Sequence, residues 1–185
     1  MIPAPDIVKR VITALNRAEI PHMLVGSFAR NYYAEPRSTK DADVVLAMTK
    51  TSLAAFLAAL GPDFHLDGQM SFETNTGTMR NILMHPESGF TVEMFYLSDD
   101  SYDQERFQRR RKTKYDGVPT SILTAEDVIV TKLRWARSKD LDDVRDVIAM
   151  QGDEALDWSY IDRWTAVHGS QAKLERVRAS LGRSN

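Results

Sequence analysis

Asp41 and Asp43, two residues apart, have the spacing in this sequence that most directly suggests chemistry. They begin a segment that continues into Val44-Val45-Leu46, a β-branched, apolar run typical of a core strand. Because alternate side chains of a strand point to the same face, the two carboxylates must lie close together. A hard divalent cation with oxygen ligands is the usual reason to keep both ionised, so the pair predicts a metal site suited to phosphoryl transfer.

A third carboxylate, Glu93, lies inside the apolar stretch from Thr91 to Leu97, which also has the character of a strand. An unpaired ionised carboxylate is costly to bury, so Glu93 is expected to bind a cation. A strand beside the aspartate strand would bring it to the same metal. The alternative is an exposed hairpin position at which Glu93 pairs with a lysine or arginine.

Gly26 and Ser27 follow the short apolar run Met23-Leu24-Val25 and precede a segment with helical character that extends to about Ala34. At such a junction glycine permits close backbone approach, serine offers a hydroxyl, and the helix N-terminus presents free N–H groups. These features suit a triphosphate. Taken alone, the pair also fits an ordinary turn with a serine cap.

The elements that would position these residues change along the chain from mixed to helical. Asp6 precedes an amphipathic helical pattern as an expected N-cap, and residues 81–85 and 90–97 flank a Pro-Glu-Ser-Gly turn as an expected hairpin. From Thr124 onward the periodicity is almost entirely helical. We therefore expect an α+β (α/β) fold with a small mixed β-sheet flanked by helices, in which residues 1–122 form the core and residues 123–185 a helical part packed on it as one unit.

Composition limits the classes of protein to which the chain can belong. Its 185 residues lack cysteine, which excludes a disulfide framework and a thiolate zinc site and fits the cytoplasm. No run approaches the roughly 18 apolar residues of a membrane span. The net charge of -2 gives no overall basic surface for nucleic acid, although the cluster from Arg109 to Lys112, with Arg106 and Lys114, could grip RNA or phosphate tails or form a solvated helix end.

The order of these motifs resembles a known superfamily. Val25-Gly26-Ser27-Phe28-Ala29, with thirteen residues between Ser27 and Asp41-Ala42-Asp43, resembles the signature of polymerase-β-like nucleotidyltransferases. The stretch from Arg37 to Asp43 looks like the Arg-x-Thr-x-Asp-hydrophobic-Asp form of the AbiEii-type branch, which comprises toxins of bacterial toxin–antitoxin pairs and uncharacterised relatives. The segment from Leu123 to Asp143 is similar to that branch's helical segment, so the resemblance covers roughly residues 20 to 150.

The resemblance implies a minimal nucleotidyltransferase fold and an enzyme that moves an NMP from an NTP to an acceptor with release of pyrophosphate. It implies Mg²⁺ or Mn²⁺ as the cofactor and these site residues: Asp41, Asp43 and Glu93 as catalytic metal ligands, Gly26, Ser27, Arg37, Thr39 and Lys132 as nucleotide or phosphate contacts, and Asp143 orienting Lys132. The sequence departs from the pattern in having glutamate at 93, where many relatives have aspartate.

The resemblance leaves several partners open. The acceptor is expected to be an RNA or tRNA end, a protein side chain or a small molecule such as an aminoglycoside, and the protein could pair with a cognate toxin or antitoxin. The alternative is a catalytically inactive nucleotidyltransferase fold that serves as a binding or regulatory module. The reason for this alternative is the glutamate at position 93.

Overall fold

The computed structural model describes residues 4–48, 50–74 and 77–181, which form two compact units. The first, called here the sheet unit, comprises Met1–Phe28 and Ser38–Leu123. The second, the helical unit, comprises Ala29–Arg37 and Thr124–Asn185. The expected division after residue 122 resembles this one, but the helical unit also includes a segment from the first part of the chain.

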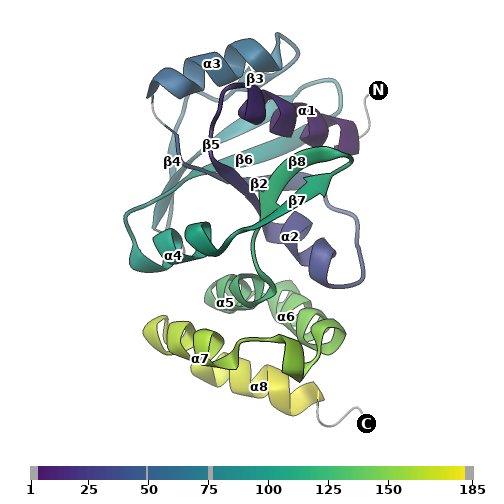
Figure 1. Cartoon of the computed structure of the whole chain (residues 1–185), viewed down its shortest axis with the longest axis vertical. Helices are drawn as coiled ribbons and strands as arrows, with labels where there is room; N and C mark the ends of the chain where they lie inside the picture. The colour runs from purple at the N-terminus through teal and green to yellow at the C-terminus, as the bar shows by residue number, and fades with distance from the viewer. Residues whose placement is uncertain (1–3, 49, 75–76, 182–185) are drawn as a thin grey trace. The chain divides into compact units, whose positions relative to one another are not determined.

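The sheet unit is built on one mixed sheet with the strand order β3-β5-β6-β2-β1-β8-β7, and β4 pairs with β5 (Figure 1). The strands are β1 (His22–Val25), β2 (Asp41–Leu46), β3 (His65–Leu66), β4 (Ser71–Glu73), β5 (Thr78–His85), β6 (Phe90–Tyr96), β7 (Arg111–Tyr115) and β8 (Val118–Ile122). The pairs β2–β6 and β1–β8 are parallel, and the other pairs are antiparallel. The predicted mixed sheet and the β5–β6 hairpin are confirmed.

One face of the central strands is apolar because their side chains alternate. Val44 on β2 and Val92 and Met94 on β6 are buried, whereas Asp43 and Glu93 between them are partly exposed. Helix α1 (Ala4–Arg17) contacts β6 and β8, and it packs along α3 (Lys50–Leu60). One face of the sheet thus packs in the core, and the carboxylates lie on the other face.

Helix α1 begins earlier than its sequence suggests. Asp6 lies in its first turn rather than at the N-cap, because the helix already includes Ala4 and Pro5. Proline is tolerated in the first helical turn, where its missing N–H has no intrahelical partner. The predicted apolar face is buried, with side chains of Ile7, Val8, Val11, Ile12 and Leu15 in the core.

The β7–β8 hairpin begins within the basic cluster from Arg109 to Lys112, for which a solvated helix end was one of the two expectations. Helix α4 (Ser101–Arg109), capped by Asp100, ends before Arg111, and the chain then forms two antiparallel strands. Asp116 and Gly117 turn between them with φ of 46° and 80°. Asp-Gly is the preferred pair for a two-residue hairpin turn of this kind, because both positions need a positive φ. That dipeptide was the available signal for the hairpin.

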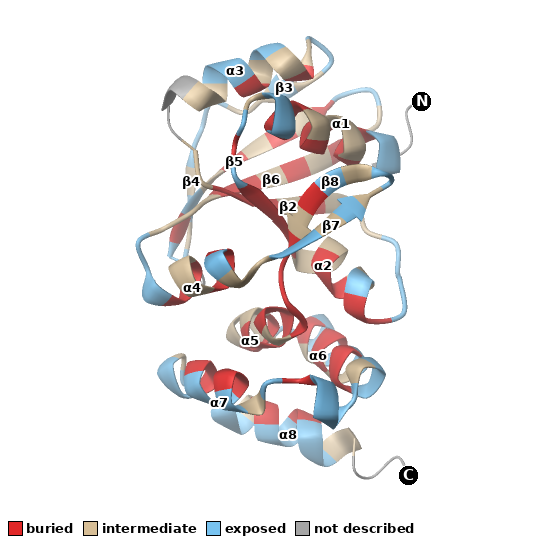
Figure 2. Ribbon diagram, viewed as in Figure 1, coloured by how far each residue is buried: buried red, intermediate tan, exposed pale blue. Residues whose placement is uncertain are grey.

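The helical unit contains α5 (Ala125–Trp135), α6 (Ser138–Gln151), a short 3-10 helix (Asp153–Ala155), α7 (Trp158–Val167) and α8 (Gln171–Leu181). Helix α5 packs on α6 and α7, and α8 packs on the same two helices. Their facing sides are buried (Figure 2), as the periodicity predicts. Among the described residues, no helix has both the length and the apolar character needed to cross a membrane.

The start of α5 is held by a buried polar contact. Thr124 caps the helix by accepting the Asp127 N–H, and its hydroxyl donates to the Asp127 carboxylate at 2.8 Å. The Tyr160 hydroxyl of α7 donates to the other oxygen of the same carboxylate. Since Asp127 is fully buried, its oxygens need these donors, and the contact fixes α7 against α5.

Tyr160→Phe is expected to lower the free energy of unfolding by about 1–3 kcal/mol, because it leaves a buried carboxylate oxygen without this donor. Urea denaturation followed by circular dichroism measures the loss. Tyr32→Phe, at a tyrosine that is 52% exposed, is the matched control and should change stability little. Equal effects of the two substitutions would contradict the assignment.

Candidate functional site

The register of the central strands brings the three predicted carboxylates together on one face. Asp43 on β2 aligns with Glu93 on β6, and Asp41 aligns with Thr91. Aligned residues on paired strands project to the same side of a sheet, so Glu93 lies directly beside Asp43. All three carboxylate residues are partly exposed, so they remain accessible from the solvent side.

The turn at Gly26 approaches one of these carboxylates very closely. Val25 on β1 aligns with Asp43, and Gly26 follows with φ of 57° as α2 (Gly26–Tyr33) begins. A Cβ atom at Gly26 would lie 1.9 Å from Asp43 Oδ2 and 2.8 Å from its Cγ. Both the backbone conformation and the lack of space therefore require glycine. Ser27 lies in the first turn of α2, where N–H groups lack intrahelical partners.

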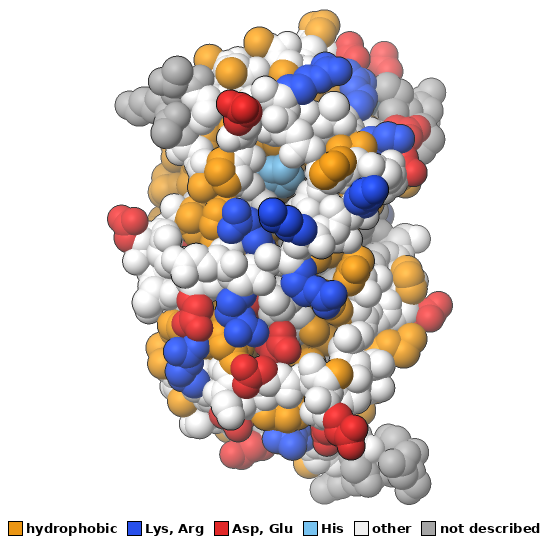
Figure 3. All heavy atoms as spheres, in the orientation of Figure 1, with side chains coloured by type: hydrophobic (Ala, Val, Ile, Leu, Met, Phe, Trp, Pro, Cys, Tyr) orange, Lys and Arg blue, Asp and Glu red, His pale blue; other side chains and the backbone are white. Residues whose placement is uncertain are grey.

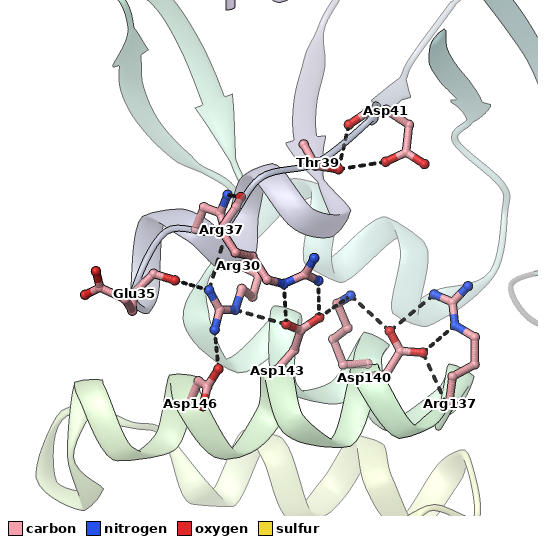
Figure 4. Close-up of polar contacts among 11 residues, drawn as sticks. Arg30, Glu35, Arg37, Thr39, Asp41, Arg137, Asp140, Asp143 and Asp146 are labelled. Carbon is pink, nitrogen blue, oxygen red and sulfur yellow. Dashed lines mark hydrogen bonds and ion pairs between the residues drawn. The ribbon is translucent and has the colours of Figure 1, made fainter. Parts of the chain in front are cut away.

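Thr39 holds the other aspartate. Its hydroxyl donates to Asp41 Oδ1 at 2.8 Å and lies 3.1 Å from the Asp41 carbonyl oxygen (Figure 4). The threonine was predicted as a nucleotide contact, and the structure gives it a further part in orienting a carboxylate. A fixed orientation matters because ligands that are already positioned lose less entropy when they bind an ion.

Glu93 pairs with an arginine across the β5–β6 hairpin, as the alternative interpretation of this position expected, although the sequence did not indicate which basic residue it would be. Arg80 on β5 donates from Nη1 to Glu93 Oε2, and the same atom lies 3.8 Å from Glu73 on β4. The described residues contain no group of three or more acidic, histidine or cysteine side chains arranged to hold a metal. In this structure the face thus offers an aspartate pair and a glutamate whose charge is balanced by arginine. The sequence did not identify Arg80 as this partner because the first strand of the hairpin was expected to begin at residue 81, whereas β5 begins at Thr78.

The helical unit contains a partly buried network of ion pairs between four basic and three acidic side chains (Figure 4). We call it the ion-pair network; its members are Arg30, Arg37, Lys132, Arg137, Asp140, Asp143 and Asp146. Its three acidic residues all lie on α6 at successive intervals of three positions, so neighbouring ones share a helix face. Three of the predicted phosphate-site residues are therefore members of one cluster.

Asp143 is the centre of this network. Lys132 Nζ lies 2.8 Å from Asp143 Oδ2 and 3.0 Å from Asp140 Oδ1. Arg37 binds Asp143 with two hydrogen bonds, from Nε at 3.1 Å and Nη2 at 2.9 Å. Arg30, which is 2% exposed, approaches the same carboxylate at 3.0 Å through Nε. The last contact was not predicted, since an arginine in a helical segment gives no sign of which carboxylate it will meet.

The basic side chains of the network determine the ionisation of its aspartates. Burial by itself would raise the pKa of Asp143, but hydrogen bonds from Arg37 and Lys132, and their charges, bring it below the usual value. Burial opposes the same fall for Asp140, whose pKa is lowered by Arg137 and Lys132. Asp140 and Asp143 are therefore ionised at neutral pH, and their charges hold the side chains of Lys132, Arg37 and Arg137 in place.

Comparison with known proteins gives one family and several structures. Residues 4–171 match the sequence profile of a family described as nucleotidyl transferase of unknown function (DUF2204). No curated protein sequence matches significantly.

Solved structures resemble the chain at low sequence identity. The antibiotic-resistance factor ANT(2'')-Ia has a TM-score of 0.63 at 14% identity, covering 95% of this chain and 97% of that one. An antigenic nucleotidyltransferase-like protein from Paracoccidioides brasiliensis has a TM-score of 0.59 at 18% identity, covering 96% and 89%. The lincosamide antibiotic adenylyltransferase LnuA, bound to lincomycin, has a TM-score of 0.51 at 12% identity, covering 78% and 96%. At these identities the likeness supports the predicted fold.

Gly26→Ala should lower the free energy of unfolding by about 2 kcal/mol or more, because the new methyl group meets Asp43 in an unfavourable backbone conformation. Gly68→Ala is the matched control, since a Cβ there has nothing within 4 Å. Chemical denaturation of both variants measures the difference. A Gly26→Ala protein as stable as the Gly68→Ala protein would show that the close approach is wrong.

Asp143→Asn should destabilise the protein by about 3 kcal/mol or more at neutral pH, because it leaves buried basic groups without their partner. The folded pKa of Asp143 lies below the unfolded one, so its stabilisation is complete above about pH 4 and is lost as the pH falls through the folded pKa. The difference from wild type should therefore narrow in acid.

Denaturation at a series of pH values measures this difference. Asp142→Asn changes an exposed neighbour paired with Arg145 and should cost less than about 1 kcal/mol. A difference between wild type and Asp143→Asn that stays constant down to acid pH would contradict a lowered pKa.

Proposed function

The chain belongs to this nucleotidyl transferase family, and on that premise we propose that it transfers an NMP from an NTP to an acceptor hydroxyl with the help of Mg²⁺ or Mn²⁺. The observation that carries the proposal is the contact of Gly26 with Asp43, beside Glu93. A helix N-terminus suits a phosphate and an aspartate pair suits a divalent cation, so the two side by side suit a nucleotide and its metal ion.

The donor set suits a hard divalent cation. Asp41 and Asp43 present carboxylate oxygens from one face of β2, and Thr39 already orients the first of them. We propose that these two aspartates hold the ion and that Glu93 becomes the third ligand when Arg80 releases it. A bound ion would neutralise charge on the phosphates and stabilise the attacking and leaving oxygens.

The proposed chemistry consists mostly of positioning. The acceptor oxygen attacks the α-phosphorus of the NTP, a new P–O bond forms, and the bond to the bridging oxygen of the β-phosphate breaks, so that pyrophosphate leaves. The hydroxyl proton passes to a carboxylate of the site or to water. The Ser27 hydroxyl and the N–H groups at the start of α2 would hold the triphosphate.

We propose that Glu93 alternates between two partners, the Arg80 guanidinium and the metal ion. While Arg80 is bound, the glutamate charge is already compensated. When phosphate enters, the guanidinium has an alternative anion to bind, and the glutamate becomes available to the ion. We propose that this exchange explains how glutamate can serve where many relatives have aspartate.

The role of the ion-pair network in nucleotide binding is a separate proposal that comes from the resemblance. We propose that Arg37 and Lys132 contact phosphates and that Asp143 orients both. Arg37 is suited to this because its side chain is 38% exposed, whereas that of Lys132 is 8% exposed and has two carboxylate partners. A change in the KM for NTP without loss of fold in Arg37→Gln would support the assignment.

The classes of acceptor are proposed from the structural comparisons and from the resemblance. ANT(2'')-Ia has been solved with adenylyl-2''-tobramycin and LnuA with lincomycin, so small molecules with hydroxyl groups are the first class to test. RNA ends and protein side chains, together with a toxin–antitoxin partner, follow from the AbiEii-type resemblance. Label from an NTP appearing in one of these three pools identifies the class.

Asp43→Asn should reduce transfer of label from an α-labelled NTP by about a hundredfold or more, because the variant loses one charged metal ligand. The assay combines the protein, Mg²⁺, each NTP and pools of small molecules, RNA and protein, and it measures pyrophosphate as well as labelled product. Asp99→Asn, at an exposed aspartate outside the site, is the control. Unchanged labelling by Asp43→Asn would exclude the proposed site, and nucleotide binding without pyrophosphate release would favour an inactive binding module.

A further inference from the structure

A groove of about 430 Å³ lies on the sheet unit near the beginning of β1. Its walls come from the end of α1, from β7 and β8, and from Arg110, which precedes β7. His22 in the groove is three positions before Val25, the residue aligned with Asp43, so the side chains of His22 and Asp43 project from opposite faces of the sheet. The groove is therefore distinct from the aspartate pair.

Two basic side chains in this groove have no acidic partner. Arg110 donates to the carbonyl oxygen of Phe107 and lies over that ring, with its guanidinium carbon 4.1 Å from the centroid. Within the described part of the chain, neither Arg110 nor Lys112 forms an ion pair with a carboxylate. Burial of the Arg110 guanidinium lowers its pKa. Figure 3 shows basic side chains gathered near a histidine at the level of β7 and β8.

The histidine in the groove makes two polar contacts. His22 Nδ1 lies 2.9 Å from the carbonyl oxygen of Ile20, and Nε2 lies 3.1 Å from the Thr120 hydroxyl. The Ile20 carbonyl can only accept, so Nδ1 carries a proton and donates to it, while the Thr120 hydroxyl also lies 3.5 Å from the carbonyl oxygen of Ser121. Burial, together with the nearby charge of Arg110, lowers the pKa of His22. Among the residues that line the groove, Arg110 and Lys112 are the lysine and arginine side chains, and Glu19 is the carboxylate.

We propose that this groove binds a phosphate group, with Arg110 and Lys112 as its cationic ligands. A guanidinium presents two parallel donors that match phosphate oxygens, and an ammonium adds a second charge, so the two together balance a phosphate dianion. The Ser121 hydroxyl on the wall can donate a further hydrogen bond. The volume suits a small phosphorylated molecule. The proposal does not depend on the transfer reaction.

The test is a titration of the full chain with inorganic phosphate, followed by ¹H–¹⁵N NMR at constant ionic strength. We expect saturable shifts of the amides of residues 110–113 and 120–121 and of the His22 ring. Arg110→Gln should weaken binding about tenfold, and Lys112→Gln should weaken it severalfold. Lys114→Gln removes the same charge from the same strand outside the groove and should change affinity less than about twofold.

The same titration with other ligands distinguishes phosphates of an RNA backbone from those of small molecules. A short single-stranded oligoribonucleotide that shifts the same amides more tightly than inorganic phosphate would assign the site to backbone phosphates, and tighter binding of phosphorylated sugars would assign it to small molecules. Non-saturating shifts spread over the surface, or equal weakening by Lys114→Gln, would overturn the proposal. If Arg110→Gln does not fold, as its spectrum would show, Lys112→Gln compared with Lys114→Gln decides the matter.

Discussion

The position of Asp43 between two neighbouring strands governs the candidate active site. On one side β1 ends at Val25, and the backbone turns so closely that Gly26 leaves no room for a side chain. On the other side Glu93 occupies the aligned position of β6. Any shift of β2 by one residue would move both aspartates to the apolar face, so strand register and site geometry are the same constraint.

In the helical unit, charged side chains are buried by pairing them with one another. Its ion-pair network buries several charges, which is tolerable because its two buried carboxylates, Asp140 and Asp143, are each bound by more than one donor. Such a cluster gives little net stability but strongly selects one arrangement of side chains. The network thus keeps the side chains of Arg37 and Lys132 in fixed positions, which is a requirement for any role in recognising phosphate.

Sequence patterns predicted the parts of the fold that depend on local periodicity. The spacing of Asp41 and Asp43 was sufficient to place them on one face, and the apolar surroundings of Glu93 indicated a strand. The parallel pairing that brings Glu93 beside Asp43 depends on tertiary structure, as do the partners Arg80 and Arg30. The β7–β8 hairpin was missed because its many basic residues hid the Asp-Gly turn, although that turn was visible in the sequence.

The parallel pairing of β2 with β6 also bears on how the protein folds. These strands lie side by side, yet some forty residues separate them, whereas β5 and β6 are joined by a short turn. Closing so large a loop costs conformational entropy before any contact is gained. The aspartates and Glu93 therefore meet through a pairing of strands that are distant in the sequence, so forming the acidic face costs more loop-closure entropy than forming the β5–β6 hairpin.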